Sequence, residues 1–102
     1  MPANRLIHSE PFSLSGGEVK SLSIAFVPPA NPNTRSATIT LLRGGPVYFR
    51  AVEGESPTSS DRPIELGDEL DVIGSEDLRL LRIMTPVSAN LEISYFGGGQ
   101  QS

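Results

Sequence analysis

Short stretches of alternating polar and apolar residues, separated by glycine and proline, constrain the fold of this chain more than any other feature. In residues 36–43, Ile39 and Leu41 fall on one side of an extended chain and threonines fall on the other. Comparable alternation predicts further strands over residues 19–27, 47–53, 70–73 and 91–96. Because these stretches recur without long helical patterns between them, the sequence predicts an all-β protein. We expect a single β-sandwich or jelly roll of about seven to eight short antiparallel strands.

Residues 78–85 fit both a strand and a helix. Leucines at helical spacing follow Ser75, a residue type that suits a helix N-cap. Two-residue alternation fits an extended chain equally well, and Pro86 ends the stretch after few residues. We predict a strand over 78–85 because the flanking elements are all β, with a single helical turn over 75–78 as the alternative.

The centre of the chain, residues 46–74, is predicted to contain a strand, a long loop and a second strand. Residues 54–63 consist of glycine, proline and polar or charged residues, so they are expected to stay at the surface as a polar loop. Ile64 and Leu66 are then expected to return the chain to the core. Surface loops on a rigid scaffold commonly carry binding residues, which makes this loop a candidate contact site.

The 102 residues suffice for one domain, and both ends differ in composition from the middle. Residues 1–12 are predicted to form a polar arm with one apolar anchor, Leu6-Ile7. This arm suits either an edge strand or a segment that packs on a neighbouring chain. Residues 13–96 are predicted to form the β-sandwich domain. Residues 97–102 are rich in glycine and glutamine and are predicted to be a flexible tail.

Composition and charge argue against several classes of function. The chain has no cysteine, which excludes disulfides, thiolate chemistry and zinc–cysteine sites. Its formal net charge of −4 argues against nucleic-acid binding, and no apolar run reaches the ~20 residues that span a bilayer. The first residues lack the apolar segment of a signal peptide, so we expect synthesis in the cytoplasm. Seven of the eight basic residues are arginine, which favours protein interfaces through contacts with carboxylates.

We predict a non-enzymatic protein without metal or cofactor, because no group of residues matches a catalytic or ligand-binding pattern. His8 is the only histidine, and the chain has no G-x-S-x-G sequence to supply a nucleophile. The densest acidic run comprises Glu65, Asp68, Glu69 and Asp71. These carboxylates suit calcium, but their spacing does not match an EF-hand, so solvated turn residues are the preferred interpretation. Tyr48, Tyr95 and Phe96 are interpreted as packing residues rather than a sugar-binding or oligomer surface, since the chain has no tryptophan.

Five short motifs follow one another between residues 45 and 96: V-Y-F-R, E-G-E-S-P-T, P-I-E-L-G-D-E-L-D-V, D-L-R-L-L-R-I and L-E-I-S-Y-F. This succession resembles small β-sandwich proteins of tailed bacteriophages, in which a strand leads into a G-x-x-P-T loop. The resemblance covers about half of the chain. It implies a structural virion protein of the capsid decoration or cement type, rather than an enzyme.

The function implied by this resemblance is to decorate the capsid and to cement it by bridging neighbouring capsid subunits. The expected partners are the major capsid protein and further copies of this chain in a homotrimer. The expected location is the virion, after synthesis in the host bacterial cytoplasm. The alternative is a neck, tail or fibre module that binds a host-surface receptor or glycan. In either role, we expect the arm and two loops to supply the partner-binding residues: Arg5, Leu6 and Ile7 in the arm, Asn31, Asn33 and Arg35 in the loop 31–35, and Ser56, Thr58, Asp61 and Arg62 in the loop 56–62.

Overall fold

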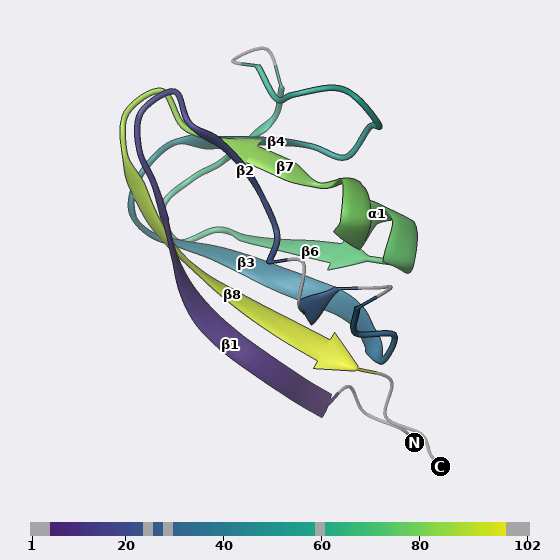
Figure 1. The fold of residues 1–102 in the computed structure, drawn as a ribbon. Helices are drawn as coiled ribbons and strands as arrows, with labels where there is room; N and C mark the ends of the chain where they lie inside the picture. Colours follow the sequence, from purple (N-terminus) through teal and green to yellow (C-terminus); the bar gives the residue numbers. More distant parts are fainter. Residues whose placement is uncertain (1–4, 24–25, 28–29, 59–60, 98–102) are drawn as a thin grey trace.

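The computed structural model describes residues 5–23, 26–27, 30–58 and 61–97, and it shows two β-sheets packed face to face (Figure 1). Sheet A contains, in spatial order, β1 (Arg5–Leu14), β8 (Ala89–Gly97), β3 (Thr34–Gly44) and β6 (Glu69–Ile73). Sheet B contains β2 (Val19–Ser21), β7 (Arg82–Met84), β4 (Val47–Arg50) and β5 (Pro63–Ile64). All pairings are antiparallel, so the predicted all-β sandwich is confirmed. The described residues also include one short helix, α1 (Ser75–Leu80).

The strand order is that of a jelly roll. β1 pairs with β8, β2 with β7, β3 with β6 and β4 with β5, as if one long hairpin had been rolled up. Successive pairs fall alternately into the two sheets, and β1 and β6 are the edges of sheet A. Of the two alternatives for the N-terminal arm, the structure shows the edge strand over residues 5–12. Residues 1–4 and 98–102, which include most of the predicted tail, lie outside the described residues.

Alternate residues of β3 and β8 build the centre of the core. Ile39 lies opposite Ile93 and Leu41 lies opposite Leu91, and each of these side chains is at most 1% exposed. Burial of this kind contributes about 1.5–3 kcal/mol for each aliphatic side chain. The threonines between the buried residues of β3 face outward, so the alternation predicted for this strand is confirmed. Sheet B closes the core from the opposite side with Ile83, which is fully buried.

The strand predicted over residues 19–27 is too long. β2 ends at Ser21, and the Phe26 amide donates to the Ser23 carbonyl (3.0 Å), so the chain turns there. The reason is that Ser23 bonds to side chains of sheet A, which draws the chain out of sheet B and across the inner face of sheet A. We name the described residues 22–23 and 26–27 the crossing segment. Residues 24–25 of the predicted strand lie outside the described residues.

A helix replaces the first half of the strand predicted over residues 78–85. α1 buries Leu78, and Leu81 directly after the helix is also buried. An extended chain would place these two side chains on opposite faces, whereas a helical turn places them on the same side. The expected serine cap is also wrong, because Gly74 occupies the N-cap position and Ser75 is the first helical residue. Within the described residues, no helix has the length and apolar character needed to cross a membrane.

Three expectations for residues 46–74 are wrong. The strand predicted over residues 47–53 ends at Arg50, and the polar loop that follows it buries Pro57. Ile64 is buried as predicted, but Leu66 is 65% exposed instead of returning to the core. The reason is that β5 is only two residues long. The next turn begins directly after it and has Leu66 at its tip.

Candidate protein-binding face

Two β-bulges shape one end of sheet A. In β1, Leu6 lies opposite Phe96 and His8 lies opposite Tyr95. Ile7 is therefore an extra residue between two pairs. Without it, Leu6 would point inward with the other even-numbered residues of β1, because side chains alternate along a strand. The bulge turns Leu6 to the outer face, where it is 59% exposed, and leaves Ile7 packed against the core.

The second bulge lies in β3, on the other side of β8. Thr34 lies opposite Gly97 and Ser36 lies opposite Phe96, which makes Arg35 the extra residue. The Arg35 side chain is exposed at this end of the sheet, whereas Thr34 is buried. Bulges in both neighbouring strands therefore flank the end of β8.

An apolar row crosses the outer face of sheet A at this end. Strand pairing places Leu6, Phe96, Ser36 and Ile73 side by side, one from each of the four strands. Ile73 is 71% exposed. The small Ser36 side chain leaves a hollow of about 230 Å³ between Phe96 and Ile73. We name Leu6, Phe96, Ile73 and the bulge residue Arg35 the Ile73 patch.

A larger hollow of about 530 Å³, which we name the Ile73 cavity, lies at the end of β6. It is lined by Pro32, Thr34, Arg35, Ile73, Gly74 and Ser75. The Gly74 amide donates to the Arg35 carbonyl (3.0 Å), so the backbone holds the ends of β3 and β6 together at the cavity wall. The cavity thus combines apolar walls with one guanidinium group.

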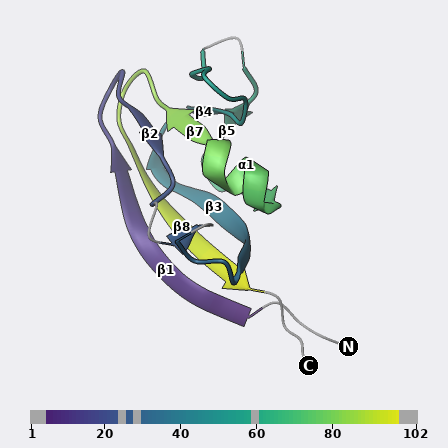
Figure 2. The same cartoon turned by 45° about the vertical axis from the view of Figure 1, so that its right-hand side comes forward.

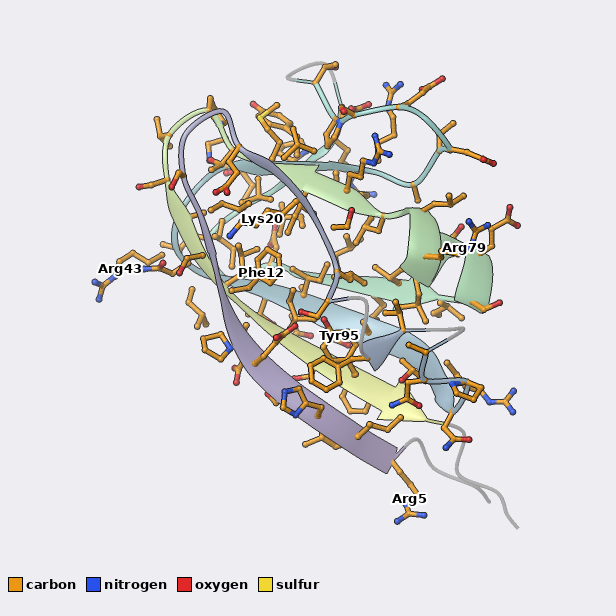
Figure 3. The ribbon with its side chains drawn as sticks, viewed as in Figure 1. Arg5, Phe12, Lys20, Arg43, Arg79 and Tyr95 are labelled. Carbon is orange, nitrogen blue, oxygen red and sulfur yellow. The ribbon has the colours of Figure 1, made fainter. Side chains whose placement is uncertain are left out.

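The structure brings two of the three predicted partner-binding regions together. The first comprises Arg5, Leu6 and Ile7 at the start of β1, and the second comprises Asn31, Asn33 and Arg35 around the start of β3. A Cβ atom on Gly97 would lie 2.9 Å from both the Asn33 carbonyl oxygen and Ile7 Cδ1, so a larger residue there would force these groups apart. Arg5 points away from the sheet at the same end (Figure 3).

The described residues of the third predicted region, 56–58 and 61–62, lie on the far side of the molecule beside sheet B (Figures 1 and 2). Arg50 of β4 donates from Nη1 to Glu55 Oε1 and from Nη2 to Asp61 Oδ1 (2.7 Å). The other Asp61 oxygen accepts from the Thr58 amide (2.8 Å). The bond from Arg50, and after it the bond from Thr58, holds the pKa of Asp61 below its usual value. Asp61 therefore anchors the loop internally, in a group of residues that we name the Arg50 clamp: Arg50, Glu55 and Asp61.

A polar cluster lies on the inner face of sheet A, and we name it the Tyr95 node: Glu10, Ser23 and Tyr95. Tyr95 is fully buried (Figure 3), and its hydroxyl donates to Glu10 Oε2 (2.7 Å) and accepts from the Ser23 amide (3.3 Å). Ser23 Oγ donates to the same carboxylate oxygen (2.7 Å). Burial, and after it the hydrogen bond to Glu10, raises the pKa of Tyr95 above its usual value. The phenol is thus held protonated, as a hydrogen-bond donor.

The only histidine of the chain packs beside this node. The His8 ring stacks on Phe26, with centroids 4.0 Å apart, and the Phe26 ring lies 5.4 Å from that of Tyr95. In a Ser-His-acid site the imidazole hydrogen-bonds to the serine. Here the Ser23 hydroxyl donates directly to Glu10. The arrangement therefore holds the crossing segment against sheet A.

Two carboxylates of the predicted acidic run accept hydrogen bonds at two separate places in the fold. Asp68 accepts from the Glu65 amide (3.2 Å) within a turn, and Asp71 accepts from Thr38 Oγ1 (2.8 Å) across the outer face of sheet A. In the part of the chain that the structure describes, no three potential metal ligands gather at one place.

Two members of the Ile73 patch are absent from the residues that the sequence predicts to bind a partner. Phe96 is interpreted there as a packing residue, and Ile73 as one position of an alternating strand. The signal that identifies them is the pairing register of four strands, which joins residues far apart in the chain. A pattern of neighbouring residues in the sequence does not reveal which strands pair or in which register.

Comparisons of the chain with protein-family models, with curated proteins and with solved structures find no match. The resemblance to bacteriophage proteins therefore rests on the short motifs quoted above.

Proposed function

We propose that this chain is a structural protein that binds neighbouring protein subunits through the Ile73 patch. Following the resemblance, we further propose that these subunits form the capsid of a tailed bacteriophage, which the chain decorates and cements. The observation that carries the proposal is the apolar row of Leu6, Phe96 and Ile73 on the outer face of a four-stranded sheet. Exposed apolar side chains gathered on one face of a sheet are a feature of interaction sites, and here Ser36 separates Phe96 from Ile73.

The composition of the patch suits a contact between proteins. Fully burying an exposed aliphatic side chain contributes about 1.5–3 kcal/mol, and Ile73, at 71% exposure, still has most of its surface to bury. Aromatic residues and arginine are enriched at protein interfaces, and the patch contains Phe96 and Arg35. The Arg35 guanidinium can make two parallel hydrogen bonds to one carboxylate of a partner.

The sheet also presents the patch on a rigid support. Next to the apolar row, the Ser9 and Ser94 hydroxyls lie 3.3 Å apart, and Thr38 donates to Asp71. A preorganised surface loses little conformational entropy on binding. We expect contact through the face of sheet A rather than its edge, because Pro11 removes one backbone donor from β1 and weakens it as a template for another strand.

The proposed location is tested on particles released by the strain that encodes the chain. Antibodies raised against the purified chain should label the heads of these particles in electron micrographs. Label confined to necks, tails or fibres would support the receptor- or glycan-binding alternative instead. Particles that carry no label at all would show that the virion proposal is wrong.

The role of the patch is tested with Ile73→Asp. Ile73 is mostly exposed, so this variant should unfold within about 0.5 kcal/mol of the wild type. Its binding to particles prepared without the chain should weaken at least ~10-fold, because docking would bury an unpaired charge. Val87→Asp is the matched control, since Val87 is 56% exposed but lies outside the patch, and it should bind normally. Equal losses in both variants would remove the patch from the proposal.

A further inference from the structure

The turn between β5 and β6 holds a leucine in solvent, and we name residues 65–69 the Leu66 turn. The Asp68 amide donates to the Glu65 carbonyl (2.9 Å), and the Asp68 carboxylate accepts from the Glu65 amide (3.2 Å). The Gly67 amide donates to the Leu41 carbonyl of β3 (3.2 Å). Leu66, at 65% exposure, is therefore fixed as a projection and does not fold back onto the core.

The Leu66 turn carries several carboxylates, whereas the described lining of the Ile73 cavity carries one guanidinium. Glu65, Asp68 and Glu69 are all exposed around the projecting leucine. Arg62 lines a neighbouring cavity with two of these carboxylates, so one guanidinium faces an excess of negative charge there. Among the described residues, Arg35 is the one charged residue that lines the Ile73 cavity.

The Ile73 cavity has the lining that a leucine side chain needs. Its volume of about 530 Å³ is larger than that side chain, and Pro32 and Ile73 supply apolar walls. Asp71 lines the neighbouring hollow, where its carboxylate would repel an acidic turn. Such a turn is therefore expected to enter the Ile73 cavity instead. Two exposed carboxylates of α1, Glu76 and Asp77, follow Ser75 at the rim but are not among the described residues that line the cavity.

We propose that Leu66 of one copy of this chain inserts into the Ile73 cavity of a second copy. A carboxylate of the inserted turn pairs with Arg35 of the second copy. The occupant is a second copy because each chain carries both complementary halves, an acidic turn with an apolar tip and an apolar cavity with a guanidinium. This inference rests on the proposed function, because it names the occupant of the Ile73 cavity and leaves Leu6, Phe96 and the hollow between Phe96 and Ile73 for other subunits.

The two halves lie at opposite ends of β6. Leu66 lies in the turn before this strand and Ile73 is its last residue, so the extended chain of β6, roughly 13 Å long, separates the turn from Ile73. One copy therefore cannot fill its own cavity. A contact between two different surfaces is head-to-tail, and it produces a closed ring or an open filament according to the rotation between copies.

Light scattering coupled to size exclusion tests the inference on the full chain. The wild type should associate with increasing concentration, whereas Leu66→Asp and Ile73→Asp should each associate ~30-fold or more weakly. A mixture of the two variants should form a dimer, because the first keeps an intact cavity and the second keeps an intact leucine. That dimer cannot grow, since its remaining cavity and remaining turn are both altered. Val87→Asp should associate like the wild type.

Two outcomes would overturn the inference: a wild type that stays monomeric up to about 1 mM, or a mixture that stays monomeric while the wild type associates. Particle binding separates this failure from that of the proposed function. Leu66→Asp should still bind particles through Leu6, Phe96 and the hollow between Phe96 and Ile73, whereas Ile73→Asp places a charge in that hollow and should not. If the wild type is monomeric and Ile73→Asp still loses particle binding, the proposed function stands without the self-association contact.

Discussion

Two polar clusters each tie a long loop to a sheet, yet water reaches them to different extents. The Tyr95 node holds the crossing segment to sheet A, and Tyr95 is fully buried. The Arg50 clamp holds the β4–β5 loop to sheet B, and its Arg50 and Glu55 side chains are 32% and 51% exposed. Water reaches the Arg50–Glu55 bond more readily than the Tyr95 hydroxyl, although Glu10 and Ser23 of the node are half-buried. Burial, rather than the number of bonds, should therefore decide how much each cluster stabilises the fold.

The two loops also differ in what they cover. The strands of sheet B are two to four residues long, too short to cover the nine to eleven residues of β8, β1 and β3. The crossing segment takes the place of the missing strand length, with Phe26 packed on His8 and near Tyr95. Loss of the node should therefore expose core surface, whereas loss of the clamp should release mainly a loop.

Tyr95→Phe should cause the largest loss of stability. The change removes the donor to Glu10 and the acceptor for the Ser23 amide, and an unsatisfied buried group costs about 1–3 kcal/mol. Urea unfolding followed by circular dichroism measures this loss. Tyr48→Phe is the matched control, because Tyr48 is half-buried and its hydroxyl has no hydrogen-bond partner among the described residues. Equal losses in both variants would contradict a special role for the node.

The raised pKa of Tyr95 predicts a loss of stability in alkali. Burial keeps this phenol neutral to a higher pH in the folded chain than in the unfolded chain, where it titrates near 10.0. Its contribution is fully present below that pH and is lost as the pH rises toward the folded-state pKa. Between about pH 10 and 12, the free energy of unfolding should fall more steeply for the wild type than for Tyr95→Phe. Urea unfolding across this pH range tests this prediction. If the free energy of unfolding fell equally with pH in both proteins, the Tyr95 phenol would not be the titrating group.

Asp61→Asn should have the smallest effect, because the Arg50 clamp is open to water. The pKa of Asp61 is lowered from 3.8, so its contribution is present above that pH and is lost as the pH falls through the folded-state pKa. At pH 7, the free energy of unfolding should fall less in Asp61→Asn than in Tyr95→Phe. As the pH is lowered further, the free energy of unfolding of Asp61→Asn should fall less than that of the wild type. Urea unfolding at stepped pH measures both, with Glu53→Gln as a control at an exposed position outside the clamp. A loss larger than that of Tyr95→Phe would reverse the comparison of the two clusters.

Local patterns were sufficient where burial follows directly from alternation. Ile39 and Leu41 lie inward because a period of two is a property of neighbouring residues, and the all-β class follows from several such stretches. The same reasoning was ambiguous for residues 78–85, whose pattern fits a helix and a strand. It was wrong for Leu66, because the apolar character of a residue does not reveal that the preceding strand ends after two residues.

The sequence by itself therefore determined the fold class and the approximate place of most strands. Only the tertiary structure decided which residues form the candidate face. The Ile73 patch depends on the register between four strands and on the two extra residues Ile7 and Arg35. A shift of one residue moves a side chain to the opposite face of a sheet, so these long-range pairings decide whether Leu6 packs inside or faces a partner. Alternation is local and register is not, which is why the sequence predicts the strands but not the face that they build.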